Sequence, residues 1–222
     1  CHIFLSPAIF CKGGKLLQKP APTKGEAVKV PPVFMPFFTL TVPFHALHCH
    51  PACVYPEGLA IEASATRTAQ GDIDFEFRVT GPVDTLDIPA PDAPAAADNL
   101  WQHTCCEAFV GIPGEDAYHE FNFSPSGQWA SYRFNGYRQR DTAFAPATRP
   151  QLAFSRRPVA LHLSARLPSA LLPQGNTFDI ALSAVIESAD GSKSYWALVH
   201  PAAQPDFHLR QNFVLTLPAQ EK

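Results

Sequence analysis

The chain has 222 residues, of which 46% are hydrophobic and 17% charged, with 23 prolines and a formal net charge of −3. The hydrophobic content excludes global disorder, the lack of an apolar run of about 18 residues excludes a membrane-spanning helix, and the proline density excludes a long helical bundle. The weak negative charge argues against broad electrostatic binding to nucleic acid or anionic lipid.

Residues 1–40 differ in composition from the rest of the chain. Lysine, proline and glycine alternate there with short apolar patches, and neither a helical nor a strand period persists. We therefore expect a proline- and lysine-rich appendage, extended or poorly ordered, followed by one domain over residues 41–222. No signal peptide is evident, and the six cysteines of a chain this long need not pair. Reduced thiols and a cytoplasmic location are the expectation.

The segment 45–53, with the sequence HALHCHPAC, places five nitrogen or sulfur ligands within nine residues. It has neither a paired CxxC nor a second spaced pair, so it fits structural zinc patterns poorly. We expect instead a strand with His48 and His50 on one face and Cys49 turned inward, and no bound metal.

Short segments with alternating apolar and polar residues follow, separated by turn signals. The predicted strands are 59–67, 73–80, 101–110, 118–123, 129–134, 159–167, 178–187, 194–200 and 213–217. The sequences QGD at 70–72, SPSG at 124–127 and ADGS at 189–192 join three pairs of these as hairpins. Most of the remaining prolines lie between the strand segments, as expected where a residue cannot donate to a ladder. This pattern predicts an all-β fold, an antiparallel β-sandwich of about nine to ten strands.

The middle hairpin carries the densest polar pattern. A four-residue loop at 124–127 would pair Asn122 with Trp129 and Glu120 with Ser131. One face would then be a core of Phe121, Phe123, Ala130, Tyr132 and Phe134, and the other would carry Tyr118, Glu120, Asn122, Trp129, Ser131 and Arg133. An acid, an amide, a guanidinium and an aromatic ring side by side suit a polyhydroxyl ligand. The alternative is a solvated face with a Glu120–Arg133 ion pair.

Two further segments place tryptophan beside ionisable groups. On a strand over 101–110, Trp101, His103 and Glu107 would share one face, and Trp196 would share a face with His200. Indole rings stack on sugar rings while carboxylates and amides bind hydroxyls. The alternative is that both indoles are core rings. Glu107 and Glu120 could also form a glycosidase pair, but nothing in the sequence fixes their separation, and no phosphate loop, nucleophile elbow or HExxH motif is present.

Three blocks of the sequence resemble a known family. They are LWQHTCCEAF at 100–109, YHEFNFSPSGQWASYRF at 118–134, and YWALVHP at 195–201 with PDFH at 205–208. Together they are similar to the bacterial DOMON-like proteins, in a superfamily with family-9 carbohydrate-binding modules and DOMON haem domains. The resemblance implies an immunoglobulin-like or jelly-roll sandwich that binds a ligand on one concave sheet. In the sugar-binding relatives two tryptophans clamp the sugar, which places Trp101 and Trp196 in those roles.

The resemblance and the residue patterns together predict a non-catalytic module for a saccharide or similar small polar ligand. The candidate ligand-binding residues are Trp101, His103, Glu107, Glu120, Asn122, Trp129, Arg133, Trp196, His200 and His208. One alternative is a haem-binding electron-transfer domain. The only methionine, Met35, lies outside the matching region, so haem would need two histidines from among His103, His119, His200 and His208. The other alternative is a structural or interaction domain without a small ligand. No cofactor is expected.

Overall fold

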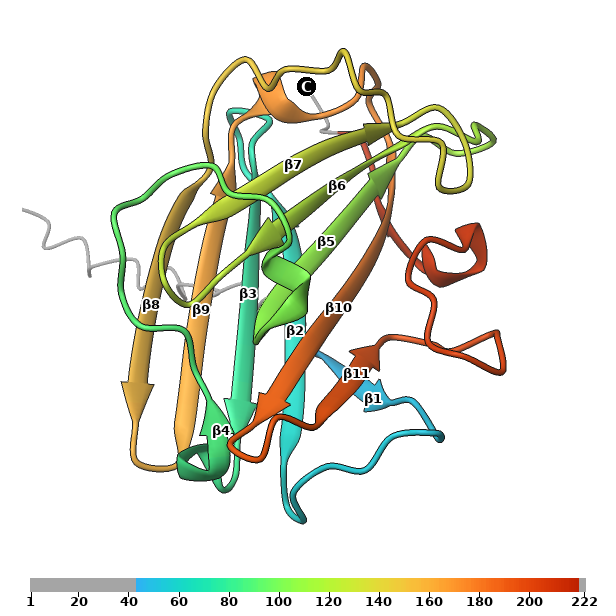
Figure 1. Ribbon diagram of the computed structural model, residues 1–222. Coiled ribbons are helices and arrows are strands. Elements are labelled where there is room, and N and C mark those ends of the chain that lie inside the picture. Colours follow the sequence, from blue (N-terminus) through green and yellow to red (C-terminus); the bar gives the residue numbers. More distant parts are fainter. Residues whose placement is uncertain (1–42, 220–222) are drawn as a thin grey trace, which may run out of the picture. The chain divides into compact units, whose positions relative to one another are not determined.

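In the computed structural model, residues 43–219 can be described, and they fold almost entirely as β-strands (Figure 1). The strands are β1 His45–Cys49, β2 Ala60–Arg67, β3 Ile73–Thr80, β4 Leu86–Asp87, β5 Cys105–Gly111, β6 Tyr118–Phe123, β7 Trp129–Phe134, β8 Gln151–Arg157, β9 Ala160–Leu167, β10 Phe178–Ser188, β11 Lys193–Ala197 and β12 Leu215–Leu217. The appendage expected over residues 1–40, with Met35, lies outside the described residues.

Helical structure in this part of the chain is limited to four 3₁₀ turns of three residues each. They are η1 Val83–Thr85, η2 Leu100–Gln102, η3 Ser169–Leu171 and η4 Arg210–Asn212. No helix within residues 43–219 has the length and apolar character needed to cross a membrane.

The strands form two antiparallel layers joined by β1. One layer, the β2–β3 sheet, runs in the order β1-β2-β3-β9-β8. The other, the β5–β10 sheet, runs β7-β6-β5-β10-β11-β1, with β4 and β12 also pairing with β10. Because β1 pairs with β2 on one side and β11 on the other, it links the two layers. The predicted all-β antiparallel sandwich is confirmed, with β8 as a strand that the alternating pattern did not reveal.

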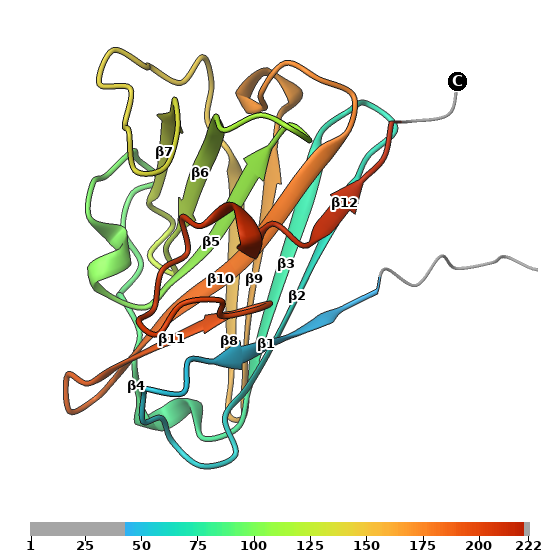
Figure 2. The ribbon, with the colours of Figure 1, turned by 90° about the vertical axis from the view of Figure 1, so that its right-hand side faces the viewer.

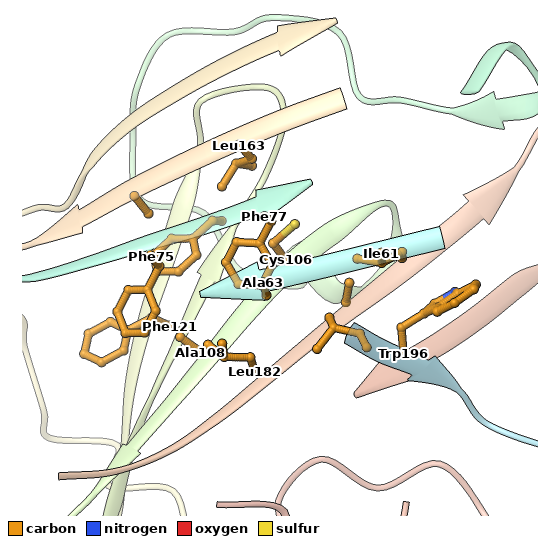
Figure 3. Close-up of a cluster of buried hydrophobic side chains, with 14 of the residues drawn as sticks. Ile61, Ala63, Phe75, Phe77, Cys106, Ala108, Phe121, Leu163, Leu182 and Trp196 are labelled. Atoms are coloured by element: carbon orange, nitrogen blue, oxygen red, sulfur yellow. The ribbon is translucent and has the colours of Figure 1, made fainter. Parts of the chain in front are cut away.

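The core lies between the two layers and follows the period-two alternation of the strands. From the β2–β3 sheet, Ile61, Ala63, Phe75, Phe77 and Leu163 point inward, and from the β5–β10 sheet Cys106, Ala108, Phe121, Leu182 and Trp196 meet them (Figure 3). The intervening side chains of β5, β6, β10 and β11 must therefore point to the opposite face of the β5–β10 sheet. That outer face is where the polar residues of these strands lie.

Two of the predicted hairpins are confirmed and the register of the third is corrected. β2 and β3 pair throughout, and β10 and β11 pair across the Asp-Gly turn. In the β6–β7 hairpin the Ser124 N–H donates to the Gln128 carbonyl at 3.0 Å, so the loop has five residues, 124–128. Phe123 therefore pairs with Trp129 and Glu120 with Tyr132. A one-residue shift turns every β7 side chain to the other face.

The 101–110 segment is also corrected at its start. Residues Leu100–Gln102 form η2, and β5 begins only at Cys105. Trp101 is therefore carried by a turn at the end of the sheet and not by the strand. The proline-rich segment before it, with Asp92 and Ala95 held by backbone hydrogen bonds to Ser126 and Trp129, lies along the outer edge of β7.

Gly81, directly after β3, lies so close to the main chain at Gly58 that only glycine fits there. Its φ is +120°, and a Cβ there would lie 2.4 Å from the Gly58 carbonyl oxygen. We expect Gly81→Ala to lower the free energy of unfolding by about 3 kcal/mol or more, since backbone strain adds to a collision with main chain. Urea denaturation measures this loss.

The matched control is Gly114→Ala. Gly114 also has a positive φ, +81°, but nothing lies within 4 Å of a Cβ there. It should lose only the backbone contribution, about 1 kcal/mol. Equal losses for the two variants would show that the contact with Gly58 does not matter.

Candidate functional site

A cavity of about 620 Å³ lies on the outer face of the β5–β10 sheet, within the size range of small-molecule sites. Its lining residues are Asn99, Trp101, Glu107, Glu120, Tyr132, Phe134, Arg138, Arg140, Val185, Tyr195, Gln204, Pro205, Phe207 and His208. The strands supply the floor, and three segments supply the walls: 98–103, 135–141 and 199–209. In both ribbon views the segment after β11, drawn in red, lies beside β10 (Figures 1 and 2).

Two buried carboxylates form part of the floor. Glu107 and Glu120 are 3% and 6% exposed, although both line the cavity. Glu107 pairs with Asn122 in the register of β5 and β6, so Glu120, two residues earlier on β6, is its diagonal neighbour on the same face. The register of the two strands brings the acids together, which the sequence alone left open.

A hydrogen-bond network fixes both carboxylates. Asn122 Nδ2 donates to Glu120 Oε1 at 2.6 Å, and Ser183 Oγ donates to Glu107 Oε2 at 3.3 Å. The buried Asn122 accepts in turn from Cys105 Sγ at 3.6 Å. Asn122 therefore lies beneath the cavity and orients Glu120, and it is not one of the lining residues.

His208 connects the floor to the wall. Its Nδ1 lies 2.9 Å from Tyr118 Oη, and its Nε2 lies 3.7 Å from Glu120 Oε2. Burial lowers the pKa of His208 to about 4, with a smaller lowering from the Arg138 charge. At neutral pH the imidazole is uncharged, so the contact with Glu120 is not an ion pair.

The carboxylates themselves resist ionisation. Burial, together with the charge of Glu120, raises the pKa of Glu107 well above its usual range. Burial also raises the pKa of Glu120 to about 7, against the lowering effects of the Asn122 hydrogen bond and of Arg138 and Arg140. Because two adjacent desolvated carboxylates cannot both ionise freely, the pair holds at least one proton at neutral pH.

The two arginines of the wall are each paired with an aspartate. Arg138 Nη2 lies 2.8 Å from Asp206 Oδ1, and Tyr137 Oη donates to Asp206 Oδ2 at 2.6 Å, which fastens the 135–141 segment to the 199–209 segment. Arg140 lies 3.5 Å from an Asp98 oxygen and over the Tyr132 ring. Arg138 also has a left-handed φ of +54°, a conformation that costs energy for a residue other than glycine.

Trp101 and three polar side chains of the cavity have no hydrogen bond within residues 43–219. Trp101 is 47% exposed, and its indole N–H is free. The amides of Asn99 and Gln204 and the hydroxyl of Tyr195 are likewise without a partner in the described part of the chain. These groups are available to a ligand without breaking an existing contact.

Trp196 does not face Trp101 across the cavity. It is 3% exposed and belongs to the core between the layers, where its Nε1 donates to Ser194 Oγ at 2.9 Å (Figure 3). The expected pair of clamping tryptophans is therefore wrong. The neighbouring residue on β11, Tyr195, points to the outer face instead and lines the cavity.

The shifted β6–β7 register removes two more predicted residues from the site. Arg133 lies on the face opposite Glu120 and donates to Asp141, with an Nε–Oδ2 distance of 3.0 Å, so no Glu120–Arg133 ion pair forms. Trp129 is buried beside the 95–97 segment. Tyr132 and Phe134, expected in the core, take their places on the cavity face.

Two predicted histidines also lie outside the cavity. His103 forms a hydrogen bond with Glu187, with an Nδ1–Oε2 distance of 2.7 Å. His200 donates from Nε2 to the His48 carbonyl and packs edge-on against His50, which is buried and not on an open face with His48. Of the ten predicted residues, Trp101, Glu107, Glu120 and His208 line the cavity, and Asn122 supports it.

Each of the four histidines considered as haem ligands bonds to a different residue of the protein. His119 bonds the Leu171 carbonyl, and only His208 of the four lines the cavity. Within residues 43–219, no group of three or more His, Cys, Asp or Glu side chains is placed to hold a metal ion. Of the segment 45–53, residues His45–Cys49 form β1.

Several lining residues carried no signal in the sequence. Arg138, Arg140 and Gln204 lie in irregular segments, where no periodicity shows which way a side chain points. Asn99, with a left-handed φ of +63°, precedes η2 in a segment expected only as a surface loop. The pair Arg138 and Arg140, soon after a predicted strand, is the one sequence feature that could have pointed to this wall.

Neither the comparison with protein-family models nor that with curated proteins gave a match. Solved structures do match. A "putative carbohydrate-binding protein" from Bacteroides uniformis superposes with a TM-score of 0.58 at 18% identity, over 80% of this chain and 86% of that one.

Two structures of a family-9 carbohydrate-binding module from Caldicellulosiruptor kristjanssonii match more weakly. The complex with glucose has a TM-score of 0.49 at 10% identity, over 82% of this chain and 85% of the other. The complex with cellotriose has a TM-score of 0.46 at 12% identity, over 71% and 72%. The Bacteroides match supports the sandwich fold, while the narrower resemblance to DOMON-like proteins stays a prediction from the sequence.

Proposed function

We propose that this protein is a non-catalytic module that binds a saccharide in the cavity over the β5–β10 sheet. The observation that carries the proposal is the exposed Trp101 ring at the edge of a cavity. The amides, hydroxyl and carboxylates of this cavity can still form hydrogen bonds to a ligand. An indole face packs on the C–H face of a sugar ring, and unpaired polar groups bind its hydroxyls. The Bacteroides structure with the same fold is named for carbohydrate binding, which supports the assignment.

The geometry favours binding over hydrolysis. A glycosidase needs one carboxylate as acid and a second as nucleophile or base on opposite sides of the bond that is cut. Here Glu107 and Glu120 lie side by side on adjacent strands of one floor, each held by a hydrogen bond from a neighbour. Burial raises the pKa of Glu107 well above its usual range and that of Glu120 to about 7, so neither carboxyl is held in the ionised form that a nucleophile or base requires.

The test is a titration with a panel of mono- and oligosaccharides, followed by calorimetry on the variant Trp101→Ala. Calorimetry is needed because Trp101 is itself the expected fluorescence reporter. We expect saturable binding by the wild-type protein and at least about a tenfold weaker affinity in Trp101→Ala. Trp129→Phe, a change at a tryptophan outside the cavity, should leave the affinity unchanged.

Two results would contradict the proposal. One is the absence of a saturable response to every saccharide in the panel. The other is equal affinity in the wild-type protein and Trp101→Ala, which would place the sugar away from the cavity.

A further inference from the structure

The charges around the cavity do not balance. Arg138 is matched by Asp206 and Arg140 by Asp98, both within 3.5 Å. That leaves Glu107 and Glu120 as two acids without a basic partner within salt-bridge distance, apart from the uncharged His208. A buried carboxylate without a cation either takes up a proton or acquires a cation from outside.

We propose that the saccharide bound here carries a protonated amino group, which lies against Glu107 and Glu120. This inference rests on the proposed function and names the class of sugar. The ligand is then an amino sugar with a free ammonium group, and the two carboxylates are its specificity-determining residues.

The walls of the cavity suit a cation as well. Five aromatic rings line it, and a positive charge is attracted to the face of such a ring. Their residues are Trp101, Tyr132, Phe134, Tyr195 and Phe207. The Arg140 guanidinium already lies over the Tyr132 ring, 4.1 Å from its centroid, so this wall accepts a positive charge within the protein itself.

The charged and titratable groups facing the acids come from every surrounding element. Besides the two acids themselves, the strands supply Cys105, Tyr118, Tyr132 and Tyr195, and the walls supply Arg138, Arg140, Asp98, Asp206 and His208. The arginines repel an ammonium only weakly, because each is neutralised by its aspartate. With both glutamates ionised the set carries two negative charges in excess, which an ammonium group reduces.

The direction of proton exchange separates an amino sugar from a neutral one. An ammonium group favours the ionised form of Glu107, so its binding expels a proton from the pair and strengthens as the pH rises toward neutrality. A neutral sugar that accepts a hydrogen bond from protonated Glu107 retains that proton. Its binding weakens as the pH rises through the pKa of the pair.

The experiment compares glucosamine, N-acetylglucosamine and glucose by calorimetry at about pH 6.5, where a primary amine is protonated. Each titration is run in two buffers that differ in ionisation enthalpy. We expect glucosamine to bind about tenfold more tightly than the other two and to release about one proton, while the neutral sugars release none. Glu107→Gln should abolish both the preference and the proton release.

Glu76→Gln is the matched control. Glu76 pairs with His162 on the β2–β3 sheet, on a different part of the domain from the cavity, so this variant should behave as wild type. Equal affinities for the three sugars, or tight glucosamine binding without proton release, would overturn the inference and leave the proposed function intact. Failure of all saccharides to bind would instead overturn the proposed function.

Discussion

Replacing Trp196 by alanine is expected to lower the free energy of unfolding by about 3–5 kcal/mol. The indole is 3% exposed, belongs to the core between the two layers and packs edge-on against Tyr55, with ring centroids 4.7 Å apart. Its loss leaves a cavity and deprives the buried Ser194 hydroxyl of the Nε1–H donor that lies 2.9 Å away. Chemical denaturation measures the change.

For Trp101→Ala we expect the opposite result, a change in saccharide binding with little change in stability. Trp101 is 47% exposed and has no hydrogen bond within residues 43–219, so its removal should change the free energy of unfolding by no more than about 0.5 kcal/mol. Saccharide affinity should fall at least about tenfold in Trp101→Ala and be unchanged in a Trp196→Phe variant that folds. A stable Trp196→Phe protein without sugar binding would restore Trp196 to the site.

Most of the fold could be predicted because strand alternation and proline placement are local properties of the sequence. The segments at Ile73–Thr80 and Tyr118–Phe123 alternate clearly and form strands with the expected bounds. β8, Gln151–Arg157, was not predicted, since this edge strand is largely exposed and its apolar residues Leu152 and Phe154 are too few to stand out. The general architecture follows from these local patterns, whereas the formation of an edge strand depends on the strand that it pairs with.

The site was harder to predict than the fold because it depends on which of the two faces of a strand each side chain occupies. In β7, Trp129–Phe134, aromatic and polar residues occur on both faces, so either set could be assigned to the core. The loop has five residues and not four, and this places Tyr132 rather than Ser131 opposite Glu120. In β11, Trp196 was expected on the ligand face, but it lies in the core and Tyr195 lines the cavity. A single residue of register is enough to exchange a wall residue for a core residue.

Glu107 and Glu120, two of the candidate residues, line the cavity, and a physical reason made them stand out in the sequence. Glu107 and Glu120 lie on strands that are buried along their whole length, so a carboxylate there has to face either a partner or a cavity. The arginines and Gln204 could not be found in the same way. They reach the cavity from segments whose conformation is set by tertiary contacts such as the Arg138–Asp206 ion pair.

Between about pH 7 and pH 8 we expect the free energy of unfolding to fall as the pH rises, by up to about 1.4 kcal/mol per pH unit. Burial and the neighbouring Glu120 charge raise the pKa of Glu107 well above its usual range. In this window the folded protein keeps the Glu107 proton while the unfolded chain has lost it. The unfolded state binds fewer protons, so rising pH favours it.

Other titrating groups act mainly outside this window. Burial lowers the pKa of His119, His200 and His208, and stability gained from these groups is complete once the pH exceeds the ordinary histidine pKa of about 6.5. The cysteine thiols, whose pKa values burial raises, begin to act only above about pH 8. Glu120, with a pKa of about 7, contributes at the lower edge of the window.

Glu107→Gln therefore should remove most of the decline and leave a protein more stable than wild type at about pH 8. Glutamine keeps the shape of the protonated acid and can still accept the Ser183 hydrogen bond, so the variant is expected to fold. Urea denaturation at several pH values between about 7 and 8 measures the slope. Glu76→Gln, a change at a partly exposed Glu76–His162 hydrogen bond away from the cavity, should retain it. An unchanged slope in Glu107→Gln would mean that Glu107 is ionised in the folded protein, which would also remove the reason for expecting a proton to leave when an amino sugar binds.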